Sequence, residues 1–401
     1  MWTKCHDGAM AETTRDLDLV LFGATGFTGG LTADYLAAHG PSGLRWALAG
    51  RNRTKLEAVR ARLATAHPDL GELELVVVDA GDQDALADVV RRAKVVVTTV
   101  GPYQQLGGPL VAACAETGTD YVDLTGEPEF VDTTYVAHHE AAVASGARIV
   151  HACGFDSIPH DLGAYFTVKE LQATGPVTLR GVVRAAGSAS GGTFHSAMGA
   201  FSRAKQMSAA AKARRRAEGK PADGRRSRAV AGKPHRDKDL GYWLLPMPTI
   251  DPQVVARSGA ALAAYGPDFR YSHYAGTKTL RYAVGGLAGV SLIGVAAQVP
   301  PARNFLLKRV PQGHGPDEAK RAASWFTVEF VAESGGRSLR TKVSGGDPGY
   351  GETAKMLAES ALCLAFDDNP PTAGSVTTAQ AMGDNLLTRL QARGITFAVV
   401  D

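Results

Sequence analysis

The sequence predicts an α/β protein in which a Rossmann-type doubly wound parallel sheet, over residues 16–155, is followed by an α+β domain with a mixed or antiparallel sheet. Three observations predict it. Valine-rich apolar runs alternate with helical patterns up to about Gly154, a glycine-rich turn follows the first run, and the alternation then stops. Runs that are apolar on both faces are typical of a parallel sheet covered by helices on both sides. A chain of 401 residues also exceeds one ordinary domain.

The first domain is expected to contain six strand-and-helix units. Thr54 and Glu57 have the spacing of a capping box, which starts a helix after the second strand, and Asp82 is expected to cap the helix after the third. Six such units form a nucleotide-binding domain whose ligands lie at the carboxyl ends of the strands. The expected strands are "LDLVLFG", "LRWALAG", "LELVVVD", "KVVVTTVG", "DYVDL" and "ARIVHACG".

The second part of the chain, residues 156–375, is expected to form the substrate domain. "VTLRGVVRAAGS" has the pattern of a strand, and two further strands are joined as a hairpin at Gly335-Gly336. "GETAKMLAESALCLAF" and "AQAMGDNLLTRLQARG" have helical periodicity. The last residues, 376–401, form a helix and a strand that either stay with this domain or return to the first.

Composition excludes several classes of protein. The net charge of +3 is too small to indicate a nucleic-acid-binding protein. The four cysteines are scattered, which argues against a disulfide framework or a zinc site and fits a reducing compartment. The first residues have no apolar core of the kind that a secretory signal needs, so we expect a cytoplasmic protein. No group of potential ligands has metal-binding spacing, and we expect no metal.

Residues 203–239 are unusually rich in lysine and arginine, including Arg214, Arg215 and Arg216. We expect a mobile or insert-like region. It is either a solvated loop or a surface for a membrane or an acidic carrier protein. Nucleic acid is the least favoured partner, because no aromatic residues interleave with the basic ones.

Residues 282–299 carry no charge and have basic residues on both sides. Three interpretations are open: a buried core helix, a lipid-facing segment near the substrate entrance, and a spanning helix. The basic flanks would suit anionic lipid head groups, so peripheral contact with a membrane is one expectation.

The stretch "VLFGATGFTGG" places three glycines between an expected strand and an expected helix, which is the context of a dinucleotide-binding turn. Gly23 allows a tight turn, Gly26 lets the backbone approach a pyrophosphate, and Gly29 lets the helix pack close to the strand. The helix N-terminus then offers unpaired N–H groups to the phosphates. The residues expected to bind the cofactor here are Gly23, Ala24, Thr25, Gly26, Phe27, Thr28 and Gly29.

The end of the second strand indicates which nucleotide binds. An NAD-binding domain usually has an acidic residue there for the ribose 2′-hydroxyl. Here the strand ends at Gly50, and Arg51, Arg53 and Lys55 follow without an acid. A guanidinium pairs well with a 2′-phosphate, so we expect NADPH, unless these are ordinary solvated charges.

Two further strand ends complete the expected cofactor site. Asp79 follows the third strand, where the adenine should lie. Val100, Gly101 and Pro102 follow the fourth strand on the nicotinamide side.

Several motifs together resemble the saccharopine dehydrogenase-like NADP-binding family: "GATGFTG", "AGR", "VGPY", "YVDLTGE" and "CGFDSIPHDLG". "SGGT" at 190–193, "GDPGYGETAKML" at 346–357 and "AMGDNLLTRLQARGITF" near the C-terminus are similar to the trans-acting enoyl reductases of actinobacteria. The resemblance spans residues 18–397. It implies an NADPH-dependent enzyme that reduces a carbon–carbon double bond in a long-chain acyl or polyketide intermediate. It also implies that the synthase or carrier protein holding this intermediate is separate.

Such a reduction needs donors that polarise the substrate carbonyl and a group that supplies a proton. Tyr103 is the first candidate, the alternative being an aromatic packed in a loop. Asp156 and Ser157 either take part or cap the next helix, and Tyr350 lines the pocket or lies in a plain loop. Two other functions stay open: a reductase of a ketone or imine, and a non-catalytic, cofactor-binding, lipid-associated protein. An oligomer is compatible with the sequence.

Overall fold

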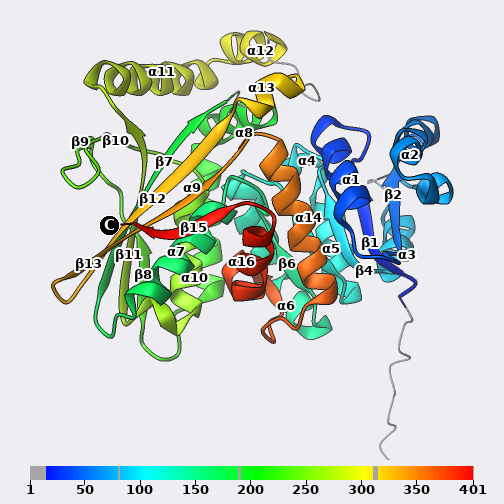
Figure 1. Ribbon diagram of the computed structural model, residues 1–401, viewed down its shortest axis with the longest axis horizontal. Helices are drawn as coiled ribbons and strands as arrows, with labels where there is room; N and C mark the ends of the chain where they lie inside the picture. Colours follow the sequence, from blue (N-terminus) through cyan, green and yellow to red (C-terminus); the bar gives the residue numbers. More distant parts are fainter. Residues whose placement is uncertain (1–14, 80–81, 188–190, 310–314, 401) are drawn as a thin grey trace, which may run out of the picture.

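The computed structural model describes residues 15–79, 82–187, 191–309 and 315–400. The chain forms two sheets that lie side by side, with helices between them (Figure 1). The first sheet has seven parallel strands in the order β14-β6-β5-β4-β1-β2-β3, so the expected doubly wound fold is confirmed. Its strands are β1 (Leu17–Phe22), β2 (Trp46–Gly50), β3 (Glu74–Val77), β4 (Ala93–Thr98), β5 (Asp120–Asp123), β6 (Arg148–Val150) and β14 (Gly374–Val376).

Alternate residues of β1 pack into two different hydrophobic cores, one on each face of the first sheet. Leu19 and Leu21 pack with α1 (Phe27–His39), α2 (Arg53–Ala66) and α14 (Gly351–Phe366). Val20 and Phe22 pack on the other face of the sheet. That face is covered by α3 (Gln83–Arg91), α5 (Gly108–Thr117) and α6 (Pro128–Ser145). Burial on both faces explains why these strands read as continuous apolar runs.

The sequence predicted the N-terminal cap of α3 correctly and that of α2 incorrectly. Asp82 caps α3, as expected, by accepting a hydrogen bond from the N–H of Ala85. The prediction of a capping box at Thr54 and Glu57 was wrong. Asn52 caps α2, because its side chain accepts from the N–H of Lys55 and the helix already begins at Arg53.

The second sheet is mixed, which confirms the expected class of the second domain. Its strands follow the order β15-β13-β12-β7-β11-β10-β9, and β8 pairs with β11. Gly335 and Gly336 have φ values of +56° and +79° and close the expected hairpin between β12 and β13. Helices α7 (Ile158–Leu171) and α10 (Asp251–Ala261) pack against this sheet. Its strands are β7 (Val177–Ala186), β8 (Arg226–Ala229), β9 (His235–Arg236), β10 (Trp243–Pro246), β11 (Asp268–Thr277), β12 (Trp325–Ser334), β13 (Arg337–Gly345) and β15 (Thr396–Val400).

The last part of the chain contributes one strand to each sheet. It returns to the first sheet before residue 376, because α14 packs on α1 and β14 pairs with β6. After α15 (Thr378–Ala381) and α16 (Gly383–Ala392) it leaves again, and β15 pairs with β13. The last strand therefore does not return to the first domain. Phe397 of β15 is buried and packs against the ring of Phe166 on α7. This apolar contact helps to hold β15 on the second sheet.

The basic segment is part of the fold and not an insert. It contains α9 (Ala204–Glu218), which packs on α6, and two strands of the second sheet, β8 and β9. Arg214 is buried and its Nε lies 2.9 Å from Asp132 Oδ1. Glu218 lies between Arg214 and Arg257, with 2.7 Å to the latter. Only Arg215 and Arg216 of the arginine run are exposed.

The charge-free segment forms α11 (Leu280–Gln298), followed by α12 (Pro300–Arg309). Figure 1 shows both helices at the edge of the molecule, beyond the second sheet. The interpretation as a buried core helix was wrong, because only 12% of its most apolar window is buried. By length and composition it is the one described helix that could cross a membrane, which by itself is weak evidence.

Candidate cofactor and catalytic site

The glycine turn after β1 has no room for side chains at two of its three glycines. Gly23 has a φ of +88°, and a Cβ there would lie 2.5 Å from Thr99 Oγ1. A Cβ on Gly29 would lie 2.1 Å from the carbonyl oxygen of Gly23. Gly26 donates its N–H to that same oxygen at 2.9 Å and stands at the exposed start of α1. The spacing of the glycines thus reflects a close crossing of α1 over the end of β1.

The first turn of α1 suits a phosphate group. No side chain caps this helix and its first turn carries no acidic residue. The N–H groups and the positive end of the helix are therefore available to an anion. Ala24 is buried, Thr25 is exposed and Thr28 is half-buried in this turn.

Phe27, the first residue of α1, and Tyr350, the residue before α14, are in contact. Their rings pack edge to face, with centroids 4.9 Å apart and an interplanar angle of 80°. The guanidinium of Arg321 lies over the ring of Phe27, 5.6 Å from its centroid. Tyr350 is buried, so its ring holds the glycine turn against the start of α14. Its expected role as a pocket residue stays a prediction.

The turn after β2 exposes its cations and holds no acid. Arg51, Arg53 and Lys55 are all exposed, and Arg53 Nε lies 3.0 Å from Glu57 Oε1, one helical turn along α2. Asp79 is exposed two residues after the end of β3. Val100 and Pro102 are half-buried and Gly101 is exposed between them, after β4. Arg51, which directly follows β2 and has no ion pair among the described residues, stays the first predicted partner of a 2′-phosphate.

We expect Arg51→Glu to weaken NADPH binding by about 10- to 100-fold, because it replaces an attractive charge by a repulsive one beside the extra phosphate. The dissociation constant for NADH should change by less than about threefold on the same scale. Fluorescence titration of both nucleotides measures the two effects. An equal loss for both would place the 2′-phosphate elsewhere.

Tyr103 lies in the core and not in an open site. Its hydroxyl donates to the carbonyl of Thr98 and accepts from the N–H of Leu124, both at 3.2 Å. Burial raises the pKa of Tyr103 well above its ordinary value. The alternative of a packed aromatic describes this residue, and its geometry does not support the expected role as a donor to substrate.

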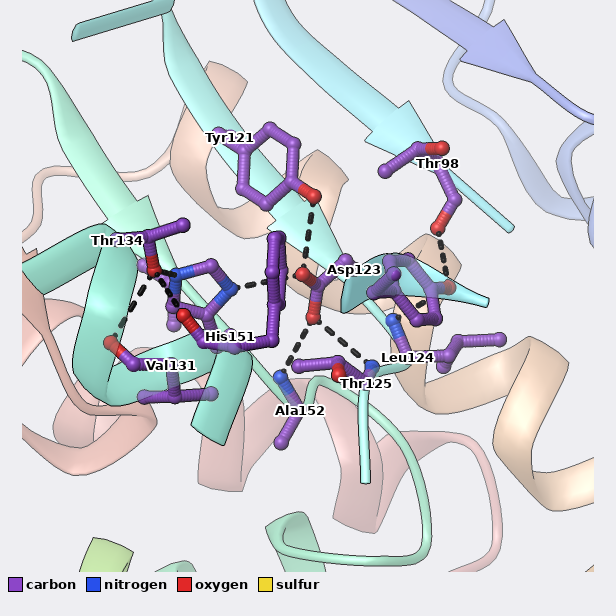
Figure 2. Close-up of polar contacts among 12 residues, drawn as sticks. Thr98, Tyr121, Asp123, Leu124, Thr125, Val131, Thr134, His151 and Ala152 are labelled. Atoms are coloured by element: carbon purple, nitrogen blue, oxygen red, sulfur yellow. Dashed lines mark hydrogen bonds and ion pairs between the residues drawn. The ribbon is translucent and has the colours of Figure 1, made fainter. Parts of the chain in front are cut away.

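A buried network behind Tyr103 holds the ends of β5 and β6 together (Figure 2). Asp123 accepts hydrogen bonds from Tyr121 Oη at 2.9 Å and from the N–H groups of Thr125 and Ala152. Its Oδ2 also lies 2.7 Å from His151 Nδ1, and His151 Nε2 lies 3.1 Å from Thr134 Oγ1. Because every one of these atoms has a partner, this network fixes the strand ends.

Asp156 and Ser157 lie just beyond the end of β6. Asp156 is half-buried, and a Cβ on Gly126 would lie 2.9 Å from its Oδ2, so its carboxyl group reaches the end of β5. Burial, helped by the negative charge of Asp251, raises the pKa of Asp156 to about 6. Ser157 is buried, does not cap α7 through its side chain, and its Oγ has no hydrogen-bond partner among the described residues. Asp156 is thus a carboxyl group that keeps its proton up to about pH 6, well above the ordinary range of an aspartate.

Sequence reasoning missed a third group at this junction. His160 on α7, Asp251 at the start of α10 and His273 on β11 converge, and all three are buried. Burial lowers the pKa of His273 to about 4, and His160 and His273 lower the pKa of Asp251 although burial opposes this. These residues lie far apart in the sequence, so no local spacing could have revealed them. The expectation that the protein binds no metal stays a prediction.

Comparison with known proteins shows which family the chain belongs to. Residues 19–150 match the family model of the saccharopine dehydrogenase NADP binding domain. A protein of Mycobacterium leprae named trans-acting enoyl reductase is 36% identical, over 96% of this chain and 98% of its own. The protein of the same name from Mycobacterium ulcerans is 35% identical with the same coverage. A relative from Mycobacterium tuberculosis, whose name gives that activity provisionally, is 39% identical over the same shares of both chains.

The chain belongs to the trans-acting enoyl reductase family. The expected resemblance and the expected NADP-type cofactor are thereby confirmed. Among solved structures, apo saccharopine dehydrogenase (L-Glu forming) from Saccharomyces cerevisiae is similar with a TM-score of 0.57 and 12% identity. It covers 96% of this chain and all of its own, and supports the fold of this chain.

Proposed function

We propose that the chain is an NADPH-dependent enoyl reductase that acts in trans on a long-chain acyl or polyketide intermediate. The observation that carries the proposal is the similarity to trans-acting enoyl reductases over both domains, including the one expected to bind substrate. NADPH, when bound, supplies the hydride. The uncapped start of α1 and the cations after β2 would hold its phosphates.

The remaining chemistry falls to side chains at the domain junction. Reduction of an α,β-unsaturated thioester leaves negative charge on the carbonyl oxygen and requires a proton at the α-carbon. Asp156, with a pKa of about 6, is protonated below that pH and can donate its proton there. Its place at the ends of β5 and β6 is where doubly wound sheets bind ligands.

The proposal is tested by NADPH oxidation with a long-chain α,β-unsaturated thioester and with a β-keto thioester. Saccharopine is a secondary amine, so it is tested in the oxidative direction, by reduction of NADP+. We expect turnover of the unsaturated thioester alone. Turnover of the keto compound or saccharopine alone would identify a ketone or imine reductase. Tight NADPH binding without turnover on any of them would favour a non-catalytic role. The substrate should be offered both as a small thioester and on a carrier protein, since Arg215 and Arg216 leave a basic surface on α9 for an acidic carrier.

We further propose that this enzyme is cytoplasmic and meets the membrane peripherally through α11. Leu292 and Val295 are 70% and 65% exposed, which is unusual for residues in a long charge-free stretch of helix. Arg281 lies in the first turn of α11 and Arg309 ends α12, so basic residues stand on both sides of the apolar stretch, where anionic head groups would lie. A long acyl substrate would be delivered from such a surface.

Flotation with vesicles tests the membrane contact. We expect the protein to float with vesicles that contain phosphatidylglycerol, less with pure phosphatidylcholine, and to stay in the dense fraction when Leu292→Glu and Val295→Glu are combined. Val136→Glu, at an exposed apolar residue on α6, is the matched control and should float like the wild type. Equal flotation of all variants would remove α11 from the contact.

A further inference from the structure

We propose that His160, Asp251 and His273 form a binding site for a divalent transition-metal ion. The three residues come from three elements, α7, α10 and β11, and their potential ligand atoms all lie within 4.8 Å of one another. Two imidazoles and one carboxylate are a common ligand set for Zn²⁺, with a further position left for water or another ligand.

The burial of the group is the first argument for an ion. His160, Asp251 and His273 are 2%, 2% and 4% exposed. Polar atoms in such a position cannot be satisfied by bulk water, and each one left without a partner is costly. Partners within the protein are therefore expected for every nitrogen and oxygen of this group.

The atoms of this group lie close together without forming hydrogen bonds. His160 Nδ1 lies 2.8 Å from Asp251 Oδ1, and His273 Nε2 lies 3.6 Å from Asp251 Oδ2. His160 Nδ1 and Asp251 Oδ1 are close enough to form an ion pair, but among the described residues neither these atoms nor His273 Nε2 have a well-aligned hydrogen-bond partner. His160 Nε2 lacks one as well. A cation shared by the three side chains would give these atoms the partner that the present contacts do not supply.

The pair of His151 and Asp123 provides an internal comparison. It has the same residue types, similar burial and a similar contact of 2.7 Å. There both ring nitrogens of the histidine and both carboxylate oxygens have hydrogen-bond partners. The protein therefore satisfies a purely structural histidine–aspartate pair completely, which it does not do at His160.

The surroundings of His273 fit a ligand. Its Nδ1 lies 3.1 Å from Tyr271 Oη, which leaves Nε2 as the atom that faces Asp251. Metal-binding histidines usually have such a partner on the second nitrogen, because it fixes the tautomer and the ring orientation. An ion at this point would tie the crossover after β6 to α10 and β11 of the second domain, next to Asp156.

The experiment uses the full chain without an affinity tag, treated with chelator, reloaded with Zn²⁺ and freed of excess ion by gel filtration. Elemental analysis should find one Zn²⁺ per chain, and loading should raise the melting temperature. His160→Ala and Asp251→Asn should reduce the content at least about tenfold, as loss of a ligand does. His151→Gln, which disturbs the comparison pair, should retain the ion.

Co²⁺ gives a second measurement that does not depend on variants. The wild-type protein loaded with Co²⁺ should show the intense visible bands of a four-coordinate ion with nitrogen and oxygen ligands. Three results would each overturn the proposal: no retained Zn²⁺, retention that is unchanged in His160→Ala and Asp251→Asn, or only the weak spectrum of hydrated Co²⁺. All three readouts are independent of enoyl reductase activity.

Discussion

Gly29→Ala should abolish NADPH binding while leaving a folded protein. The added Cβ would lie 2.1 Å from the carbonyl oxygen of Gly23 and 2.6 Å from Thr99 Oγ1. The first of these is backbone, so α1 must move away from the end of β1, and its N-terminal N–H groups move away from the phosphates. We expect the dissociation constant for NADPH to rise at least about 100-fold, equivalent to roughly 3 kcal/mol. Isothermal titration calorimetry measures this loss.

Gly30→Ala is the matched control, one residue further along the same helix. A Cβ there would have its nearest neighbour at 3.6 Å, which is an ordinary contact. Alanine also favours a helix over glycine, so this variant should bind NADPH normally and melt slightly higher. If Gly29→Ala binds as tightly as Gly30→Ala, the glycine turn does not hold the phosphates. Far-ultraviolet circular dichroism of both variants separates lost binding from lost folding.

The parts of the fold that could be predicted from the sequence are those set by local pattern. The two-sided apolar runs predicted the parallel sheet, and Gly335-Gly336 predicted the hairpin because two consecutive positive φ values need glycine. The helix after β2 began at a different cap because Asn52 lay two residues before the expected Thr54, and both residue types can cap. Such competition between neighbouring caps is settled by tertiary packing, which the sequence does not display.

The parts that could not be predicted depend on contacts between distant segments. Arg214 reads as a solvated charge in a basic run, yet Asp132 on α6 makes it a buried residue. Tyr103 stands at the expected strand end, but its hydroxyl is held by the backbone of β4 and by Leu124. His160, Asp251 and His273 meet only because α10 and β11 return to the junction beyond β6. The spacing of residues along the sequence gives no indication of these long-range contacts.

Asp156→Asn should lower activity and raise stability at the same time. The pKa of Asp156 is raised from 3.8 to about 6, so the folded protein holds this proton more tightly than the unfolded chain does. Stability is therefore lost as the pH rises from about 4 to above 6, and the full cost is present at pH 8. A shift of this size corresponds to at most about 3 kcal/mol, and water that reaches the half-buried carboxylate reduces it. Asparagine has no charge to bury, so the variant should be more stable at pH 8 and similar to the wild type at pH 4.

Its effect on catalysis runs in the opposite direction, because an amide cannot supply the proton that the product needs. We expect kcat with the unsaturated thioester to fall by about 100-fold or more, the usual size of a general-acid contribution. The wild-type rate should decline above about pH 6 as Asp156 loses its proton, and this decline should be missing in the variant. Asp88→Asn, at an exposed carboxylate on α3, is the control and should change neither the rate nor the pH dependence of stability. An Asp156→Asn enzyme that keeps its kcat within twofold would show that the raised pKa is a consequence of burial alone. A gain in stability together with a loss of rate would show instead that the buried carboxyl group is retained for its chemistry.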